Sequence, residues 1–133
     1  MPPLLPSLMT CLALLLYIGL TYNVGRMRVK HSVAAPAITG HPDFERAFRV
    51  QQNTLEQFVY FLPALWLFAL TVSVDWAAAL GSLWLVGRVM YARGYLADPK
   101  ARGPGFVIGL ATSSFMLLGS LVAIVQALLR AAG

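Results

Sequence analysis

Residues 103–129 read GPGFVIGLATSSFMLLGSLVAIVQALL, a run of 27 positions without one charged side chain. Two other uncharged runs precede it, residues 1–25 and 57–74, which are 25 and 18 residues long. A helix needs about 20 predominantly apolar residues to cross the hydrocarbon core of a bilayer. The three runs therefore predict helices that cross a membrane.

The composition of the whole chain supports the same interpretation. The chain has 133 residues, of which 59% are apolar and 11% are charged, and its mean hydropathy is +0.71. Soluble domains have about 45–50% apolar and about 25% charged residues, so a water-soluble globule is effectively excluded. Four spans of about 20 residues leave only short connections. We therefore expect an all-α integral membrane protein, a four-helix bundle with a single domain over residues 1–133.

The ten basic residues are unevenly placed and give a formal net charge of +5. They lie between and inside apolar runs rather than on one hydrophilic surface, so we expect anionic lipid headgroups beside them and no nucleic-acid partner. Nine of the ten lie in or beside the first and third loops, and Arg130 alone lies on the other side. The positive-inside rule then places both basic loops in the cytoplasm and both termini outside.

The four predicted helices cover residues 4–23, 43–74, 76–95 and 106–129. Asp43 is the predicted N-cap of the second helix, and Asp75 is the predicted connection to the third. Pro63 should kink the second helix, which a membrane helix tolerates when its neighbours satisfy the freed carbonyl. The third helix must carry Arg88 within its span, because its uncharged stretch is too short. Pro99 and the segment 103–105 predict the last turn.

Two polar faces interrupt this apolar pattern. At 100° per residue, one polar stripe lies on the second helix and another lies on the third. The stripes consist of Glu45, Arg49, Gln52, Asn53 and Glu56 in the second helix, and of Arg88, Tyr91, Tyr95 and Asp98 in the third, with Arg102 in the following turn. Ionisable residues in spanning helices are costly and usually face a bundle interior, a partner or a wet cavity. Because both stripes lie at the same depth, they predict one shared polar pocket.

The chemistry of these side chains suggests a ligand for that pocket. Arginine binds carboxylates bidentately, Glu56 can accept a hydrogen bond from an ammonium group, and Asn53 can either donate or accept a hydrogen bond. Such a set suits a zwitterion richer in carboxylates than in amines; glutathione fits this description, and so do other small anions. From spacing alone, an alternative is equally supported, in which Arg49 and Glu56 pair with each other across the bundle or between subunits and bind no ligand. No metal ligands are predicted.

A longer pattern around the same residues resembles a known family. The segment FERAFRVQQNTLE at 44–56, followed by YARGY at 91–95 and by Arg102, resembles the MAPEG family, the membrane-associated proteins of eicosanoid and glutathione metabolism. The resemblance covers essentially the whole chain. It implies a membrane four-helix bundle assembled as a homotrimer, with glutathione as co-substrate bound between adjacent subunits at the cytoplasmic side. The short loops resemble those of a bacterial member, so we expect the bacterial inner membrane.

The resemblance also implies individual roles. The expected glutathione-binding residues are Arg28, Arg49, Asn53, Glu56, Tyr91 and Tyr95. Gln51 is also expected to bind glutathione, as a contact to the site of the neighbouring subunit. Arg102 matches the arginine that lies against the glutathione sulfur and is the expected catalytic residue. A free thiol with a pKa of about 8.5 is mostly protonated at neutral pH, and a nearby permanent cation favours the nucleophilic thiolate. Two departures from the family pattern are Gln57, where the leukotriene-synthase branch has an aromatic residue, and Pro99, which makes Arg93 a second candidate for the sulfur contact.

These roles imply a glutathione S-transferase that conjugates the glutathione thiolate to lipophilic electrophiles, with peroxidase activity toward lipid hydroperoxides as a related expectation. The alternative is a non-catalytic protein that binds membrane lipid, since one branch of the family presents lipids without using glutathione. A degenerate motif would favour that alternative, but the motif residues of the second and third helices are all present. A small transporter is disfavoured, because its charged residues would be expected near the bilayer centre.

Overall fold

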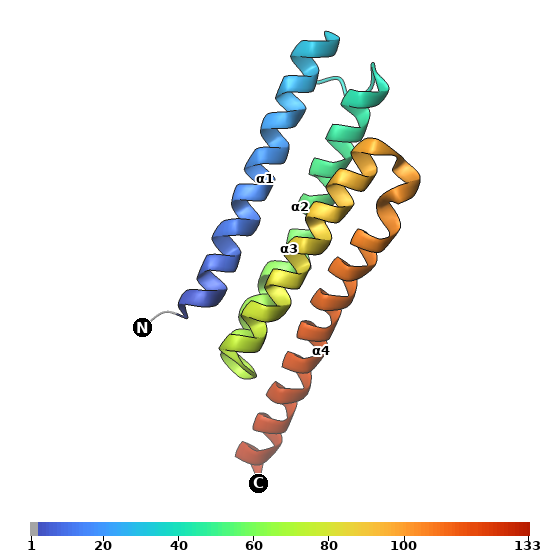
Figure 1. Ribbon diagram of the computed structural model, residues 1–133. Helices are drawn as coiled ribbons and strands as arrows, with labels where there is room; N and C mark the ends of the chain where they lie inside the picture. The colour runs from blue at the N-terminus through green and yellow to red at the C-terminus, as the bar shows by residue number, and fades with distance from the viewer. Residues whose placement is uncertain (1–2) are drawn as a thin grey trace.

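The computed structural model describes residues 3–133, and every regular element in this range is a helix (Figure 1). The elements are α1 (Leu4–His31), α2 (Pro42–Thr71), α3 (Val74–Ala97), the short 3-10 helix η1 (Pro99–Arg102) and α4 (Gly103–Ala132). Consecutive long helices run in opposite directions, so α1 starts and α4 ends at the same end of the bundle (Figure 1). The predicted all-α four-helix bundle is confirmed.

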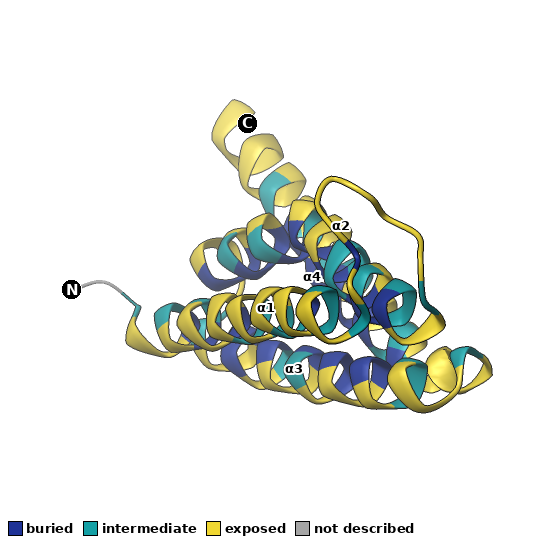
Figure 2. Ribbon diagram, turned by 90° about the horizontal axis from the view of Figure 1, so that it is seen from above, coloured by how far each residue is buried: buried dark blue, intermediate teal, exposed yellow. Residues whose placement is uncertain are grey.

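The surface of the bundle is that of an integral membrane protein. Within the described range, three segments are long and apolar enough to cross a membrane, namely Leu4–His31, Pro42–Thr71 and Pro99–Ala132. The remaining long helix, α3, packs against the other three. Buried positions face the space between the helices and exposed positions cover their outer faces (Figure 2). Those outer faces carry many exposed leucine and valine side chains, a surface that requires contact with lipid or with another subunit.

Two predicted boundaries at the basic end of the first helix pair are wrong. α1 does not end near Asn23 but continues to His31, so the basic cluster lies on its last turns, where positive side chains interact favourably with the helix dipole. The N-cap of α2 is His41 rather than Asp43. The His41 Nδ1 atom accepts a hydrogen bond of 3.1 Å from the backbone N–H of Asp43, and Pro42 takes the first helical position, where no amide donor is needed.

The other two connections also differ from the prediction. Asp75 lies in the first turn of α3, and Ser73 is the N-cap, with its hydroxyl accepting a 3.2 Å hydrogen bond from the N–H of Trp76. The segment 103–105 is not a turn but the first turn of α4. Pro104 is tolerated there because the first amides of a helix have no intrahelical acceptor. Pro63 lies inside α2, which continues past it to Thr71.

An aromatic core holds α2 against α3. The rings of Phe61 and Trp84 stack with their centroids 3.8 Å apart, and both side chains are fully buried. Nearer the basic end, α3 and α4 approach so closely that a Cβ atom on Gly105 would lie against the backbone N of Tyr91 and 2.6 Å from the carbonyl oxygen of Gly87. Such backbone contact requires glycine, and it sets Tyr91 beside the start of α4.

Candidate functional site

A polar pocket lies between α2, α3 and the start of α4, at the end of the bundle that carries the basic loops. Its volume is about 450 Å³, and it is lined by Arg49, Asn53, Tyr91, Tyr95, Arg102 and Phe106. Pockets for small molecules typically have about 300–1,000 Å³. Five of the residues predicted for a ligand site therefore line one cavity, although they come from three different elements.

The pocket has a positive charge and several hydrogen-bonding groups. Arg49 and Arg102 are both exposed at its walls, and the described residues that line it include no carboxylate. The rings of Tyr91 and Tyr95 stack with centroids 5.7 Å apart. Two guanidinium groups with tyrosine hydroxyls and an amide form a set that binds carboxylates, because arginine donates two parallel hydrogen bonds to such a group.

Behind the pocket, Arg88 supports two of the lining residues. Its side chain is 1% exposed, and its Nη1 donates a 2.7 Å hydrogen bond to Oδ1 of Asn53. Its guanidinium carbon lies 4.1 Å from the centroid of the Tyr91 ring. The predicted polar face of the third helix included Arg88 but did not distinguish this buried support from a ligand contact.

Three other predicted residues lie outside this pocket in the single chain. Arg28 donates a 2.7 Å hydrogen bond to the carbonyl of Ala37 in the α1–α2 loop, and its guanidinium lies 4.6 Å from the Phe44 ring centroid. The Gln51 amide donates a 2.9 Å hydrogen bond to the hydroxyl of Thr21 on α1. Glu56 is exposed and lies on the same face of α2 as Arg49, seven residues farther along the helix.

The alternative in which Arg49 and Glu56 pair within the chain is not observed. Among the described residues, the ion pair within 4.0 Å joins His31 to Asp43, and neither Arg49 nor Glu56 takes part in one. Arg49 instead faces the pocket. Its side chain is therefore available to a ligand or to a group from another subunit.

The two departures from the family pattern have different consequences. Gln57 is 2% exposed, its Oε1 atom lies beside Gly109, and it does not line the pocket, so this substitution changes the bundle interior. Pro99 starts η1, which carries Arg102 to the pocket wall. There Nη1 of Arg102 donates a 3.1 Å hydrogen bond to the carbonyl of Pro99. Arg93, the second candidate, is exposed and does not line the pocket.

Phe106 is the lining residue that the sequence analysis missed. Its ring centroid lies 6.4 Å from that of Tyr91, and it forms the apolar wall of an otherwise polar pocket. In the sequence, Phe106 is marked only by its position at the start of the last apolar run, and that position by itself indicates a helix rather than a pocket. The close crossing at Gly105 brings that position next to Tyr91.

Comparison with known proteins gives a consistent result over most of the chain. The sequence profile of the MAPEG family matches residues 6–122. The chain is 39% identical over 100 residues to human microsomal glutathione S-transferase 2, an alignment that covers 74% of this chain and 68% of the relative. It is 37% identical over 93 residues to guinea-pig leukotriene C4 synthase, with 70% and 62% covered. It is also 50% identical over 119 residues to an uncharacterized protein of the cyanobacterium Synechocystis, with 90% and 87% covered.

Proposed function

The chain belongs to the MAPEG family, and on that premise we propose that it is a glutathione S-transferase that conjugates glutathione to lipophilic electrophiles. The observation that carries this proposal is the pocket in which Arg49, Tyr91 and Arg102 meet. Its two cations match the two carboxylates of glutathione or one carboxylate and the thiolate. The names of two relatives, microsomal glutathione S-transferase 2 and leukotriene C4 synthase, support the same chemistry.

In the proposed reaction, Arg102 stabilises the glutathione thiolate. The thiolate sulfur attacks an electrophilic carbon of the second substrate, a carbon–sulfur bond forms, and the leaving group departs with its electron pair. Arginine suits this role because it stays protonated beside a thiolate, whereas lysine can transfer its proton. The same thiolate also supports a second activity, in which two glutathione molecules reduce a lipid hydroperoxide to an alcohol and water and are oxidised to the disulfide.

Arg49 and Asn53 bind the peptide part of glutathione in this proposal, and Tyr91 and Tyr95 donate hydrogen bonds from α3. Glu56 and Gln51 lie outside the pocket of the single chain, so their proposed roles require a neighbouring subunit; we propose a homotrimer in which glutathione binds between adjacent subunits. Arg28 is proposed to reach the ligand from the end of α1. The basic end of the bundle, and with it the pocket, would face the cytoplasm, in the inner membrane of a bacterium, with detoxification as the physiological role.

The decisive experiment measures conjugation by the full-length protein in detergent micelles. Purified protein is mixed with glutathione and 1-chloro-2,4-dinitrobenzene, a lipophilic electrophile that loses chloride when the carbon–sulfur bond forms. We expect conjugate at a rate proportional to protein concentration, and tight binding of glutathione in a calorimetric titration. If folded protein neither binds glutathione nor forms conjugate with this or other lipophilic electrophiles, the proposal is wrong.

A non-catalytic lipid-binding protein is the second candidate function. The exposed apolar side chains on the outer faces of all four helices favour contact with lipid, but they do not distinguish a lipid carrier from any other membrane protein. The polar pocket favours the transferase, because two arginines in one pocket suit the carboxylates of glutathione. Binding of lipid by folded protein that neither binds glutathione nor turns it over would favour this second function.

A further inference from the structure

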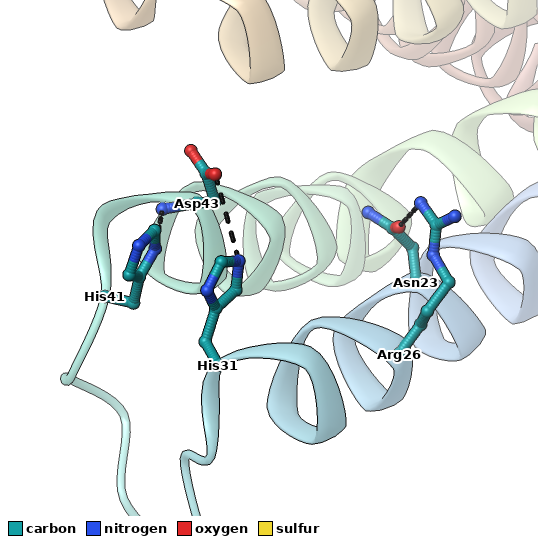
Figure 3. A network of polar contacts seen from close by, with 5 residues as sticks. All are labelled: Asn23, Arg26, His31, His41 and Asp43. Carbon is teal, nitrogen blue, oxygen red and sulfur yellow. Dashed lines mark hydrogen bonds and ion pairs between the residues drawn. The ribbon is translucent and has the colours of Figure 1, made fainter.

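Both histidines of the chain lie together at the basic end of the bundle (Figure 3), and neither lines the polar pocket. His31 is the last residue of α1 and His41 is the N-cap of α2. Their imidazole rings stack with centroids 3.6 Å apart and an interplanar angle of 13°. An oxygen of Asp43 lies 3.8 Å from Nε2 of His31. The ten-residue separation in sequence gave no metal-binding motif, and only the fold brings these three side chains together.

We propose that His31, His41 and Asp43 form a binding site for a divalent transition-metal cation of the Zn²⁺ class. One ligand atom from each side chain lies within 4.8 Å of the other two. In a tetrahedral zinc site with bonds of about 2.0–2.2 Å, the ligand atoms are about 3.3–3.6 Å apart. The stacked rings hold their nitrogen lone pairs in nearly parallel planes, so one imidazole must rotate out of the stack before both rings and the carboxylate can reach a shared ion.

The environment of His31 favours a metal ligand at its Nε2 atom. Its Nε2 is buried and makes no hydrogen bond to any residue that the structure describes, although it lies 3.8 Å from a carboxylate oxygen of Asp43. Buried polar atoms are normally satisfied, and a metal ion would satisfy Nε2 and use the carboxylate at the same time. Two imidazoles and one carboxylate form a donor set that suits Zn²⁺, with water in the remaining position.

Two features oppose binding and set its expected strength. Nδ1 of His41 accepts the capping hydrogen bond from the Asp43 backbone, and that bond is lost when His41 coordinates a metal. Arg26 and Lys30 line the hollow beside Asp43, and their charge repels a dication. Binding must therefore come from coordination by imidazole nitrogen, which favours Zn²⁺, Co²⁺, Ni²⁺ or Cu²⁺ over Mg²⁺ and Ca²⁺.

A metal at this position would join the two ends of the α1–α2 connection. The loop between His31 and His41 also supplies the carbonyl of Ala37 that holds Arg28. A bound ion would restrain that loop and the start of α2. We expect Zn²⁺ to slow trypsin cleavage after Lys30 in the intact protein, compared with the same protein in a chelator.

The test uses full-length protein purified in detergent without a polyhistidine tag and in a Cys11→Ser background, because Cys11 is the single thiol. Co²⁺ is titrated at pH 7.5 while its visible absorption is followed, and Zn²⁺ is then added as a competitor. We expect a signal that saturates at one equivalent per chain and is bleached by Zn²⁺. His31→Gln and His41→Asn should each weaken binding by more than about tenfold, and Asp75→Asn, at the other end of the bundle, should bind as the parent does.

His41→Asn keeps a side-chain acceptor at the N-cap, since asparagine is a favoured capping residue, so α2 should start normally and far-UV circular dichroism should be unchanged. The readout does not involve glutathione, so its outcome is independent of the proposed transferase activity. If the parent binds neither Co²⁺ nor Zn²⁺, or if both histidine variants bind as the parent does, the proposed site is overturned.

Discussion

Arg88 and Asn53 form a hydrogen bond of 2.7 Å that joins the interior of α3 to the wall of the polar pocket. Arginine has only donors, so the Asn53 oxygen must face it and the amide NH₂ group is left to face the pocket. A group with two donors binds a carboxylate. The buried arginine thus determines the polarity that Asn53 presents to a ligand.

Replacing Arg88 with methionine should weaken glutathione binding while leaving the bundle folded. The variant removes the donor that fixes Asn53, and a hydrogen bond to a charged group contributes about 1.5–3 kcal/mol. We expect the Kd for glutathione to rise about tenfold, equivalent to about 1.4 kcal/mol. Isothermal titration in detergent measures this change. An unchanged Kd would show that Asn53 is oriented without Arg88.

Removing one or the other partner of this hydrogen bond should change the stability of the bundle by different amounts. Asn53→Leu removes the hydrogen bond of a buried guanidinium and should destabilise the bundle by about 3–5 kcal/mol, whereas Arg88→Met removes the buried charge itself and should cost less. The double variant should recover most of the loss. Unfolding in a graded detergent series measures all four proteins as a double-mutant cycle. Additive losses in the double variant would contradict the contact.

Arg49 should bind a carboxylate of glutathione through an ionic contact. Arg49→Gln removes the charge and keeps an amide donor, so we expect the Kd to rise about tenfold or more, since hydrogen bonds to charged groups contribute about 1.5–3 kcal/mol. The parent's affinity should also fall with added salt, which screens exposed charges. Arg26→Gln is the matched control, because Arg26 is exposed, bonds Asn23 and does not line the pocket. Equal effects of the two variants would rule out a specific contact by Arg49.

Arg102 should be the cation that favours the thiolate. We expect an ultraviolet thiolate absorbance when the parent binds glutathione, and we expect Arg102→Gln to abolish it. Each unit by which the thiol pKa falls corresponds to about 1.4 kcal/mol of interaction. Arg93→Gln is the control, because Arg93 lies two residues from Tyr91 but outside the pocket. A thiolate signal lost in Arg93→Gln and kept in Arg102→Gln would reverse the assignment.

The periodicity of the sequence predicts much of this arrangement, because the polar stripes of the second and third helices stand out against apolar runs. Arg49, Asn53, Tyr91, Tyr95 and Arg102 all line one pocket. An arginine surrounded by uncharged residues in a span must face inward, and Arg88 lies on the predicted polar face. The sequence pattern does not indicate that the buried arginine bonds Asn53 rather than a ligand, because this depends on its depth within the bundle.

The boundaries were harder to predict, because local signals competed with one another. Gly25 and the basic cluster indicated a helix end, but no proline or strong breaker stops the chain before His31 and positive charges stabilise a helix C-terminus. Gly103, Pro104 and Gly105 look like a turn in sequence. They form a first helical turn because α3 and α4 must cross closely there, and that is a tertiary requirement with no local signature.

The crossing of α3 and α4 at Gly105 should therefore be sensitive to a single methyl group. A Cβ atom there would meet the backbone of Tyr91 and lie 2.6 Å from the Gly87 carbonyl oxygen, and backbone atoms cannot move aside as a flexible side chain can. We expect Gly105→Ala to destabilise the bundle by about 1–3 kcal/mol and to weaken glutathione binding, because it moves Tyr91 relative to Phe106. Gly103→Ala is the matched control, two residues away in the same turn, where an added Cβ meets nothing within 4 Å. Thermal unfolding of both variants in the same detergent measures the difference, and equal stability of the two would mean that the helices do not cross as closely as the structure places them.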